Sequence, residues 1–206
     1  MKGIVFLALA CSLACKVATV RPIESGEAEA PGGESFDPAR YVESIWSTRV
    51  VPAVENGAME CGELLQAVRT DPDATLRALG RGPRGPAHLL VKGEGVVVSV
   101  DRSSRAGLLG LDVAPRDGSP DVWLQVGPIL QGTALRDAVG FISFADFVNQ
   151  VDYADVGNAL NQRVLDSVLQ DLDAASAKGT QLSFAGVLTP GERHIVTPVR
   201  LAKREE

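Results

Sequence analysis

Hydrophobic positions between residues 36 and 86 recur at helical spacing. Asp37 followed by Pro38 is typical of an N-cap and a first helical turn. The apolar residues that follow at helical spacing are Tyr41, Val42, Ile45, Trp46 and Val50. They predict an amphipathic helix to about Val54. Two shorter helices are expected around residues 63–68 and 73–79, and the Gly- and Pro-rich stretch 80–86 ends this N-terminal helical segment.

Beyond residue 86 the pattern changes to strands. Residues 89–100 are rich in β-branched positions and contain Gly93 and Gly95, which predicts a long strand with a bulge or kink. Turn residues then separate two further strands, 108–113 and 122–126. Two more strands, 181–188 and 195–201, are joined by a hairpin at Pro190-Gly191.

A helical insertion is expected between the third and fourth strands. Ser143, with Asp146 three residues on, predicts a helix start. The apolar face of this helix would be Phe144, Phe147, Val148 and Val151. Asp152-Tyr153 is expected to interrupt it, and a cleaner helix over 155–172 would follow, ended by Lys178-Gly179.

The order of these elements predicts an α+β fold. Three strands, a helical region and two strands are the order of an OB-like five-stranded barrel. We therefore expect an OB-like barrel domain over residues 87–206 with central helices inserted between strands three and four, preceded by an N-terminal helical segment over 36–86.

The first residues form a short apolar leader. Met1-Lys2 gives a positively charged start, residues 4–10 are continuously apolar, and Ser12-Leu13-Ala14 places small residues before Cys15. This pattern is typical of a signal peptide over residues 1–14. The stretch is shorter than the ~20 apolar residues that span a bilayer, so a retained transmembrane helix is the less favoured alternative.

Cys15 is the predicted site of lipid attachment. The segment resembles a bacterial lipobox, although Ser12 stands where Leu is usual and Cys11 is a rival acceptor. Residues 15–35 would then be the lipidated cysteine and a polar tether rich in Glu, Gly, Ala and Pro. As a random coil this tether would span on the order of 25 Å.

Charge and composition narrow the function classes. The formal net charge is −6, and no concentrated Lys/Arg stripe is present, which argues against nucleic acid as a partner. The same net charge disfavours contact between the protein surface and anionic lipid headgroups. The acyl chains on Cys15 would then be the main membrane attachment. Hydrophobic residues make up 45% of the chain, enough for a folded core.

Residues with reactive or metal-binding side chains are scattered along the chain. If Cys15 is acylated and Cys11 is removed, Cys61 lacks a partner and is expected to be a small buried residue rather than a reactive thiol. His88 and His194 lie far apart without clustered ligands. The carboxylates between residues 146 and 155 lack calcium-loop spacing and glycine. We expect no metal, no cofactor and no enzyme activity.

The insertion carries the candidate ligand-binding residues. Thr133, Arg136 and Asp137 would present a hydroxyl, a guanidinium and a carboxylate to a sugar. A helix cap with a local ion pair is the favoured alternative. Asn149 and Gln150 offer amides suited to carbohydrate, as do Asn158 and Asn161, but amides at such positions more often satisfy backbone groups at helix ends.

Several runs carry a family resemblance. They are Gly127–Asp137, Phe141–Gln150 with the stretch on to Asn161, Cys15-Lys16 and Phe36-Asp37-Pro38. Together they resemble a family of bacterial periplasmic lipoproteins, domain of unknown function 2291, over nearly the whole chain. Members tend to be encoded beside sugar ABC transporters, so the resemblance implies a periplasmic, lipid-anchored protein near carbohydrate uptake. It supplies no catalytic residues, and it leaves inner or outer membrane open.

Two functions are therefore compared. The first is a membrane-tethered accessory protein that docks its barrel or N-terminal helix onto components of a sugar ABC transporter. A flat apolar patch near Trp46 would favour this function. The second is a module that binds a small carbohydrate. A pocket lined by Arg136 and the amides would favour this function.

Overall fold

The computed structural model describes residues 36–82 and 87–204. Its helices are α1 (Pro38–Ile45), α2 (Val51–Gly57), α3 (Cys61–Thr70), α4 (Pro72–Leu79), α5 (Ala134–Ala138) and α6 (Gln150–Ser167). Its strands are β1 (Met59–Glu60), β2 (Leu89–Asp101), β3 (Leu108–Val113), β4 (Val122–Gln125), β5 (Gln181–Thr189) and β6 (Ile195–Lys203). Within the described residues, no helix combines the length and apolar character needed to cross a membrane.

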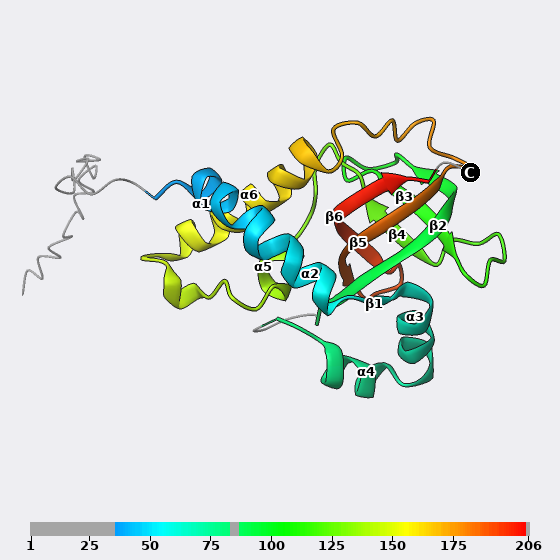
Figure 1. The fold of residues 1–206 in the computed structure, drawn as a ribbon, viewed down its shortest axis with the longest axis horizontal. Coiled ribbons are helices and arrows are strands. Elements are labelled where there is room, and N and C mark those ends of the chain that lie inside the picture. The colour runs from blue at the N-terminus through cyan, green and yellow to red at the C-terminus, as the bar shows by residue number, and fades with distance from the viewer. Residues whose placement is uncertain (1–35, 83–86, 205–206) are drawn as a thin grey trace, which may run out of the picture. The chain divides into compact units, whose positions relative to one another are not determined.

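Five of the strands close into a barrel. The sheet order is β1-β2-β3-β4-β6-β5, and β5 pairs back onto β2, so the ring from β2 to β5 has no free edge (Figure 1). The connection between β4 and β5 holds α5 and α6. The predicted α+β barrel with a helical insertion between strands three and four is confirmed. The two-residue strand β1, parallel to β2, was not predicted.

The long strand β2 is shared by both halves of the barrel. Its residues 89–96 pair with β5, and its residues 95–101 pair with β3. The predicted bulge is present but lies between Val97 and Ser99 rather than at Gly93 or Gly95. Gly93 has a different role, because a Cβ there would lie 2.9 Å from the Cβ of Cys61. The glycine therefore allows α3 to approach the barrel.

The N-terminal helix runs further than predicted. Asp37 caps it by accepting hydrogen bonds from the amides of Ala39 and Arg40, and a π-helical turn over Trp46–Val50 joins α1 to α2, which ends at Gly57. Trp46 is 6% exposed. Its predicted buried role is confirmed.

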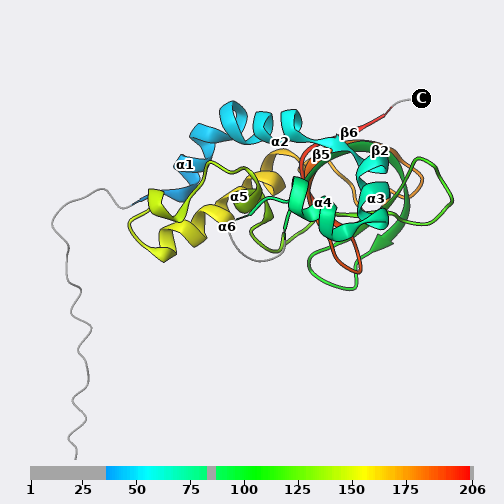
Figure 2. The same ribbon diagram turned by 90° about the horizontal axis from the view of Figure 1, so that it is seen from below.

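Two hydrophobic cores stabilise the domain. One fills the barrel and includes Leu109, Leu111 and Leu182, with Leu64 and Leu65 of α3 packed against it. The other lies between α1, α2, α5, α6 and the outer faces of β5 and β6. Figure 2 shows α1 and α2 on one side of this second core and α5 and α6 on the other. The insertion is thus held to the barrel by apolar packing.

The first half of the insertion departs from the prediction. Ser143 and Asp146 form the expected capping box, but the helix that they begin is a single 3-10 turn, Phe144–Asp146. The predicted apolar face does not form, because Val148 is 96% and Val151 66% exposed. Asp152 and Tyr153 do not interrupt a helix either; both lie inside α6, which begins at Gln150 and ends at Ser167.

Candidate functional site

Helix α5 places the candidate polar residues beside the second core. Gly132 precedes it with φ 84°, a left-handed conformation that glycine adopts without strain. The apolar side of α5 is buried through Ala134, Leu135 and Ala138. Asn161 of α6 fixes the preceding loop, since its Nδ2 donates to the carbonyl oxygen of Gly132 over 2.8 Å. The other side of α5 therefore carries Arg136 and Asp137 at a defined position.

Thr133, Arg136 and Asp137 form one connected polar cluster. The Arg136 Nε donates to Asp137 Oδ1 over 2.9 Å, and the Arg136 Nη2 lies 2.8 Å from the same oxygen. The Thr133 hydroxyl donates to Asp137 Oδ2 over 2.6 Å. The two charged side chains are only 11% and 12% exposed. The predicted local ion pair is present, but Thr133 makes no capping bond to α5.

Tyr153 of α6 completes this cluster. The Arg136 guanidinium carbon lies 3.8 Å from the centre of the Tyr153 ring, and Arg136 Nη1 donates to the Tyr153 carbonyl oxygen over 3.1 Å. Burial raises the pKa of the Tyr153 phenol, against the opposing effect of Arg136. The tyrosine was missed from the sequence because it was placed at a predicted helix break.

The approach of α6 to α5 depends on a glycine. A Cβ at Gly157 would lie 3.3 Å from Thr133 Cγ2 and 3.7 Å from Arg136 Nη1. A larger side chain at this position would push against both residues of the cluster. Gly157 therefore lets the two helices hold the cluster between them.

A cavity of about 850 Å³ opens over the cluster. We call it the α5–α6 cavity. Arg136, Asp137, Gln150 and the aromatic rings of Phe144 and Tyr153 all line it, and the centres of those two rings lie 5.7 Å apart. Its size lies within the range of small-molecule sites, roughly 300–1,000 Å³. A guanidinium, a carboxylate, an amide and two aromatic faces thus converge on one space.

A second cavity, of about 440 Å³, lies on the barrel side of Asp137. We call it the barrel cavity. Thr133 and Asp137 line it from the insertion, Gln125 from β4, and His88 from the residue before β2. The His88 Nδ1 lies 3.0 Å from the Thr189 hydroxyl oxygen, and burial lowers the pKa of this histidine. Asp137 is common to both cavities.

The predicted amides separate into different roles. Gln150 lines the α5–α6 cavity. Its neighbour Asn149 instead caps α6, because its Oδ1 accepts hydrogen bonds from the amides of Val151 and Asp152. Asn161 holds the loop before α5, and Asn158 lies 3.4 Å from the Asp155 carboxylate. The structure therefore brings four of the five candidate ligand residues to the two cavities, and Asn149 to a helix cap.

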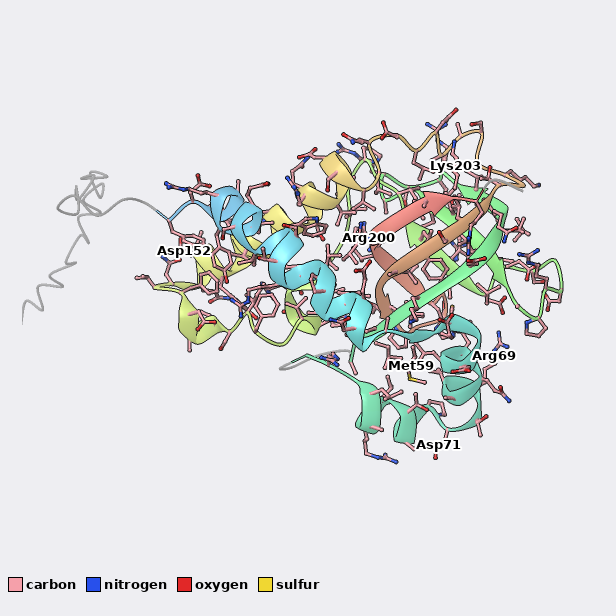
Figure 3. All side chains as sticks on the ribbon, in the orientation of Figure 1. Met59, Arg69, Asp71, Asp152, Arg200 and Lys203 are labelled. Atoms are coloured by element: carbon pink, nitrogen blue, oxygen red, sulfur yellow. The ribbon has the colours of Figure 1, made fainter. Side chains whose placement is uncertain are left out.

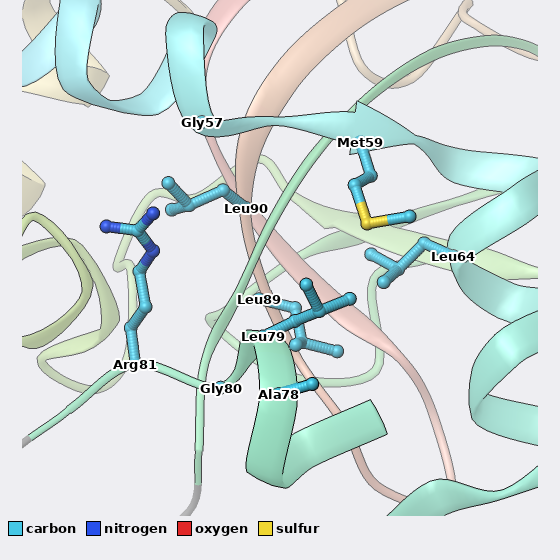
Figure 4. Close-up of a pocket in the computed structure, with 9 residues that line it drawn as sticks. All are labelled: Gly57, Met59, Leu64, Ala78, Leu79, Gly80, Arg81, Leu89 and Leu90. Atoms are coloured by element: carbon cyan, nitrogen blue, oxygen red, sulfur yellow. The ribbon is translucent and has the colours of Figure 1, made fainter. Parts of the chain in front are cut away.

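A third cavity, of about 230 Å³, lies between the end of α2, α4 and the start of β2. Figure 4 shows the aliphatic side chains of Leu64, Leu79 and Leu89 around it, with Arg81 at one side. Among the described residues that line it, Arg81 alone has a polar side chain, so the cavity gives little basis for recognising a specific ligand.

The remaining reactive groups are consistent with structural roles. Cys61 is buried, and burial raises the pKa of its thiol to about 12, which leaves it protonated and unreactive at neutral pH. Burial also lowers the pKa of His194. Among residues 36–82 and 87–204, no three potential metal ligands gather in one place. Cys15 and the predicted leader lie outside the described residues.

Comparison with known proteins gives a family and a fold. A family model described as a predicted periplasmic lipoprotein, DUF2291, matches residues 5–202. The crystal structure of an OB-fold protein from Thermotoga maritima is similar with a TM-score of 0.67 and 20% sequence identity, over 83% of this chain and 100% of that one. At this identity the likeness shows the fold alone, and it confirms the OB-type barrel. No curated protein matches the sequence.

Proposed function

Because the chain belongs to the DUF2291 family of predicted periplasmic lipoproteins, we propose that it is a lipid-anchored accessory protein whose barrel domain binds a small carbohydrate-like ligand. The ligand would occupy the α5–α6 cavity. The proposal is of a binding protein and not of an enzyme.

One observation carries this proposal: Arg136, Asp137, Gln150 and two aromatic rings line a single cavity. A carboxylate accepts hydrogen bonds from sugar hydroxyls, and a guanidinium and an amide donate to them. Each terminal nitrogen of Arg136 carries a second N–H beyond its contacts with Asp137 and Tyr153. The C–H face of a pyranose ring can pack on Phe144 or Tyr153.

The cluster is also ordered in advance of any ligand. Arg136 is held by Asp137 and by the ring and carbonyl oxygen of Tyr153, and Asp137 is held by Thr133. Preorganised groups lose less conformational freedom on binding, which raises affinity. Trp46 is buried in the core rather than offered at the surface of the N-terminal helix.

A thermal-shift screen with mono- and disaccharides tests the binding proposal. We expect at least one sugar to raise the melting temperature of the protein, and Gln150→Ala to reduce its affinity by about tenfold, the value of one hydrogen bond to a ligand. Gln162→Ala is the matched control, because Gln162 is exposed on the same helix and bonds only to Asp166 among the described residues.

Two results would contradict the proposal. The first is that no sugar shifts the melting temperature. The second is that a sugar shifts it equally in the parent, Gln150→Ala and Arg136→Lys proteins. Arg136→Lys keeps the charge but removes the forked donor geometry, so unchanged binding would place the ligand elsewhere.

Association with a sugar ABC transporter is a separate part of the proposal, and it rests on the family resemblance. Crosslinking in intact cells, followed by identification of the crosslinked proteins, tests it. We expect a component of such a transporter to be recovered. Recovery of abundant envelope proteins alone would contradict this association and leave the binding proposal standing.

A further inference from the structure

The domain exposes several large apolar side chains in one short stretch of its sequence. Phe144 is 54%, Val148 96% and Val151 66% exposed. These three residues, which we call the apolar tip, lie within one eight-residue stretch. They make up half of the large hydrophobic side chains that are exposed in the described part of the chain. Figure 3 shows Asp152, which follows Val151, at one extreme of the domain and Lys203 toward the other.

The local backbone explains why the tip points outward. Asn149 begins α6 by accepting hydrogen bonds from the amides of Val151 and Asp152. Phe147 turns inward, where its ring lies within 6 Å of the rings of Tyr41 and Tyr153. Val148 and Val151 are left on the outside of this bend. Large apolar side chains that stay exposed are unfavourable in water, and several of them in one short stretch are typical of an interaction site.

The tip lies beside the point where the N-terminal segment enters the domain. Phe36 is the first described residue, and its ring centre lies 5.4 Å from that of Phe147. The segment 16–35 joins Phe36 to Cys15, the predicted site of lipid attachment. Along the sequence, this end of the domain is therefore nearer to the predicted anchor than the barrel strands are.

We propose that the apolar tip inserts into the periplasm-facing surface of the membrane that holds the lipid anchor, as a second attachment that orients the domain. This inference rests on the proposed lipid anchor but not on carbohydrate binding. With the tip inserted, the α5–α6 cavity, whose rim includes Phe144 and Gln150, lies next to the membrane. The α5–α6 cavity would then lie where it could bind solutes at the surface of a membrane transporter.

The charges around the tip set the kind of lipid that it prefers. Asp146 lies between Phe144 and Val148, and Asp152 directly follows Val151. Asp155 lies about one turn further along α6, and Arg136 is already paired with Asp137. Asp37 lies at the start of α1, next to Phe36, and Arg40 follows it. The excess of carboxylates repels anionic headgroups. Zwitterionic phosphatidylethanolamine surfaces should therefore admit the tip more deeply than surfaces rich in phosphatidylglycerol.

Site-directed fluorescence on the acylated full-length protein tests the inference. Val148→Cys is labelled with an environment-sensitive dye, and the protein is reconstituted into phosphatidylethanolamine/phosphatidylglycerol vesicles of two compositions. Cys61 is 2% exposed and does not compete for the dye. Lys203→Cys, at an exposed position on β6, is the matched control.

We expect the emission of the dye at position 148 to shift to the blue on vesicles and to be quenched by lipids spin-labelled near the headgroup. The shift should be larger at low phosphatidylglycerol content, and the dye at position 203 should show neither effect. In a second variant, Val151→Ser on the Val148→Cys background, the blue shift should decrease, because one of the inserted apolar side chains is lost.

A dye at position 148 that reports water on vesicles, while the protein is acylated and membrane-bound, would overturn the inference and leave the anchor intact. Equal quenching at positions 148 and 203 would overturn it as well. Absence of acyl mass on the protein would instead refute the anchor, a different outcome that the mass of the same preparation reveals.

Discussion

Removing the carboxylate of Asp137 is expected to destabilise the domain through the charge that it leaves behind. In the Asp137→Ala protein the Arg136 guanidinium, 11% exposed, would keep only the carbonyl oxygen and ring of Tyr153 as partners among the described residues. Loss of one partner of a buried ion pair costs about 3–5 kcal/mol. Because both groups keep some contact with solvent, we expect about 3 kcal/mol.

The double variant Arg136→Met/Asp137→Ala separates this effect from simple loss of contacts. Methionine keeps an unbranched stem against Tyr153, and no charge is left without a partner. We expect the double variant to cost about 1 kcal/mol, less than Asp137→Ala alone, because removal of both members of a buried pair is often close to neutral. The double variant should then be about 2 kcal/mol more stable than Asp137→Ala alone.

Urea unfolding of the parent, Asp137→Ala, Arg136→Met and the double variant measures these free energies. In a thermal melt, Asp137→Ala should lower the midpoint by about 6–12 °C for a domain of this size. Glu55→Ala is the control, since the Glu55–Arg200 pair is exposed and its loss should cost less than about 1 kcal/mol. The reasoning is refuted if Asp137→Ala costs no more than Glu55→Ala, or if the double variant costs the sum of the single variants.

Three further outcomes follow from the structure. Gly157→Val should lower the free energy of unfolding in urea by about 1–3 kcal/mol, because the larger side chain overpacks against Thr133. An unchanged urea midpoint would contradict the close approach of α5 and α6. Asn161→Ala should lower the free energy of unfolding by about 1–3 kcal/mol, because the carbonyl oxygen of Gly132 loses its donor. Hydrogen exchange of the backbone amides in the loop before α5 should become faster. Unaltered exchange there would contradict the role of Asn161 in fixing this loop. Burial raises the pKa of Cys61 from its usual value to about 12, so the thiol of the unfolded chain loses its proton at a lower pH than the thiol of the folded protein. The free energy of unfolding of the parent should therefore fall between about pH 9 and pH 12, by up to ~1.4 kcal/mol per pH unit. Cys61→Ala should lack that component, and parallel stability profiles for the two proteins would contradict it.

The barrel was predictable because its strands carry their own pattern. Alternation in 181–188 and the turn at Pro190-Gly191 place β5 and β6, and the order of elements gives the OB-type topology. Closure is a long-range property, since it depends on the pairing of β5 with β2. Helix α5 was not predicted as an element because five residues are too few to show a helical period.

The predicted helix at 144–151 failed because a local cap prevailed over hydrophobic periodicity. Phe144, Phe147, Val148 and Val151 have helical spacing. The Asn149 side chain, however, bonds the amides of the following residues and starts a new helix at Gln150. The same cap separates the roles of the adjacent amides, placing Asn149 at the helix start and Gln150 at the cavity.

The candidate site was predictable in its residues but not in its shape. Thr133, Arg136 and Asp137 stand out because three polar groups with complementary hydrogen-bonding capacity lie within five positions. Tyr153 and the cavity itself arise from the packing of α6 on α5. No spacing in the sequence reports such a tertiary contact, and so the aromatic half of the site was missed.

The mass of the mature protein, purified from the membranes of the native cell, tests the central claim most directly. The account predicts a chain that begins at Cys15, lacks residues 1–14 and carries the added mass of a diacylglycerol, with or without a further acyl chain. A protein that retains Met1, or one that carries no acyl mass, would contradict it.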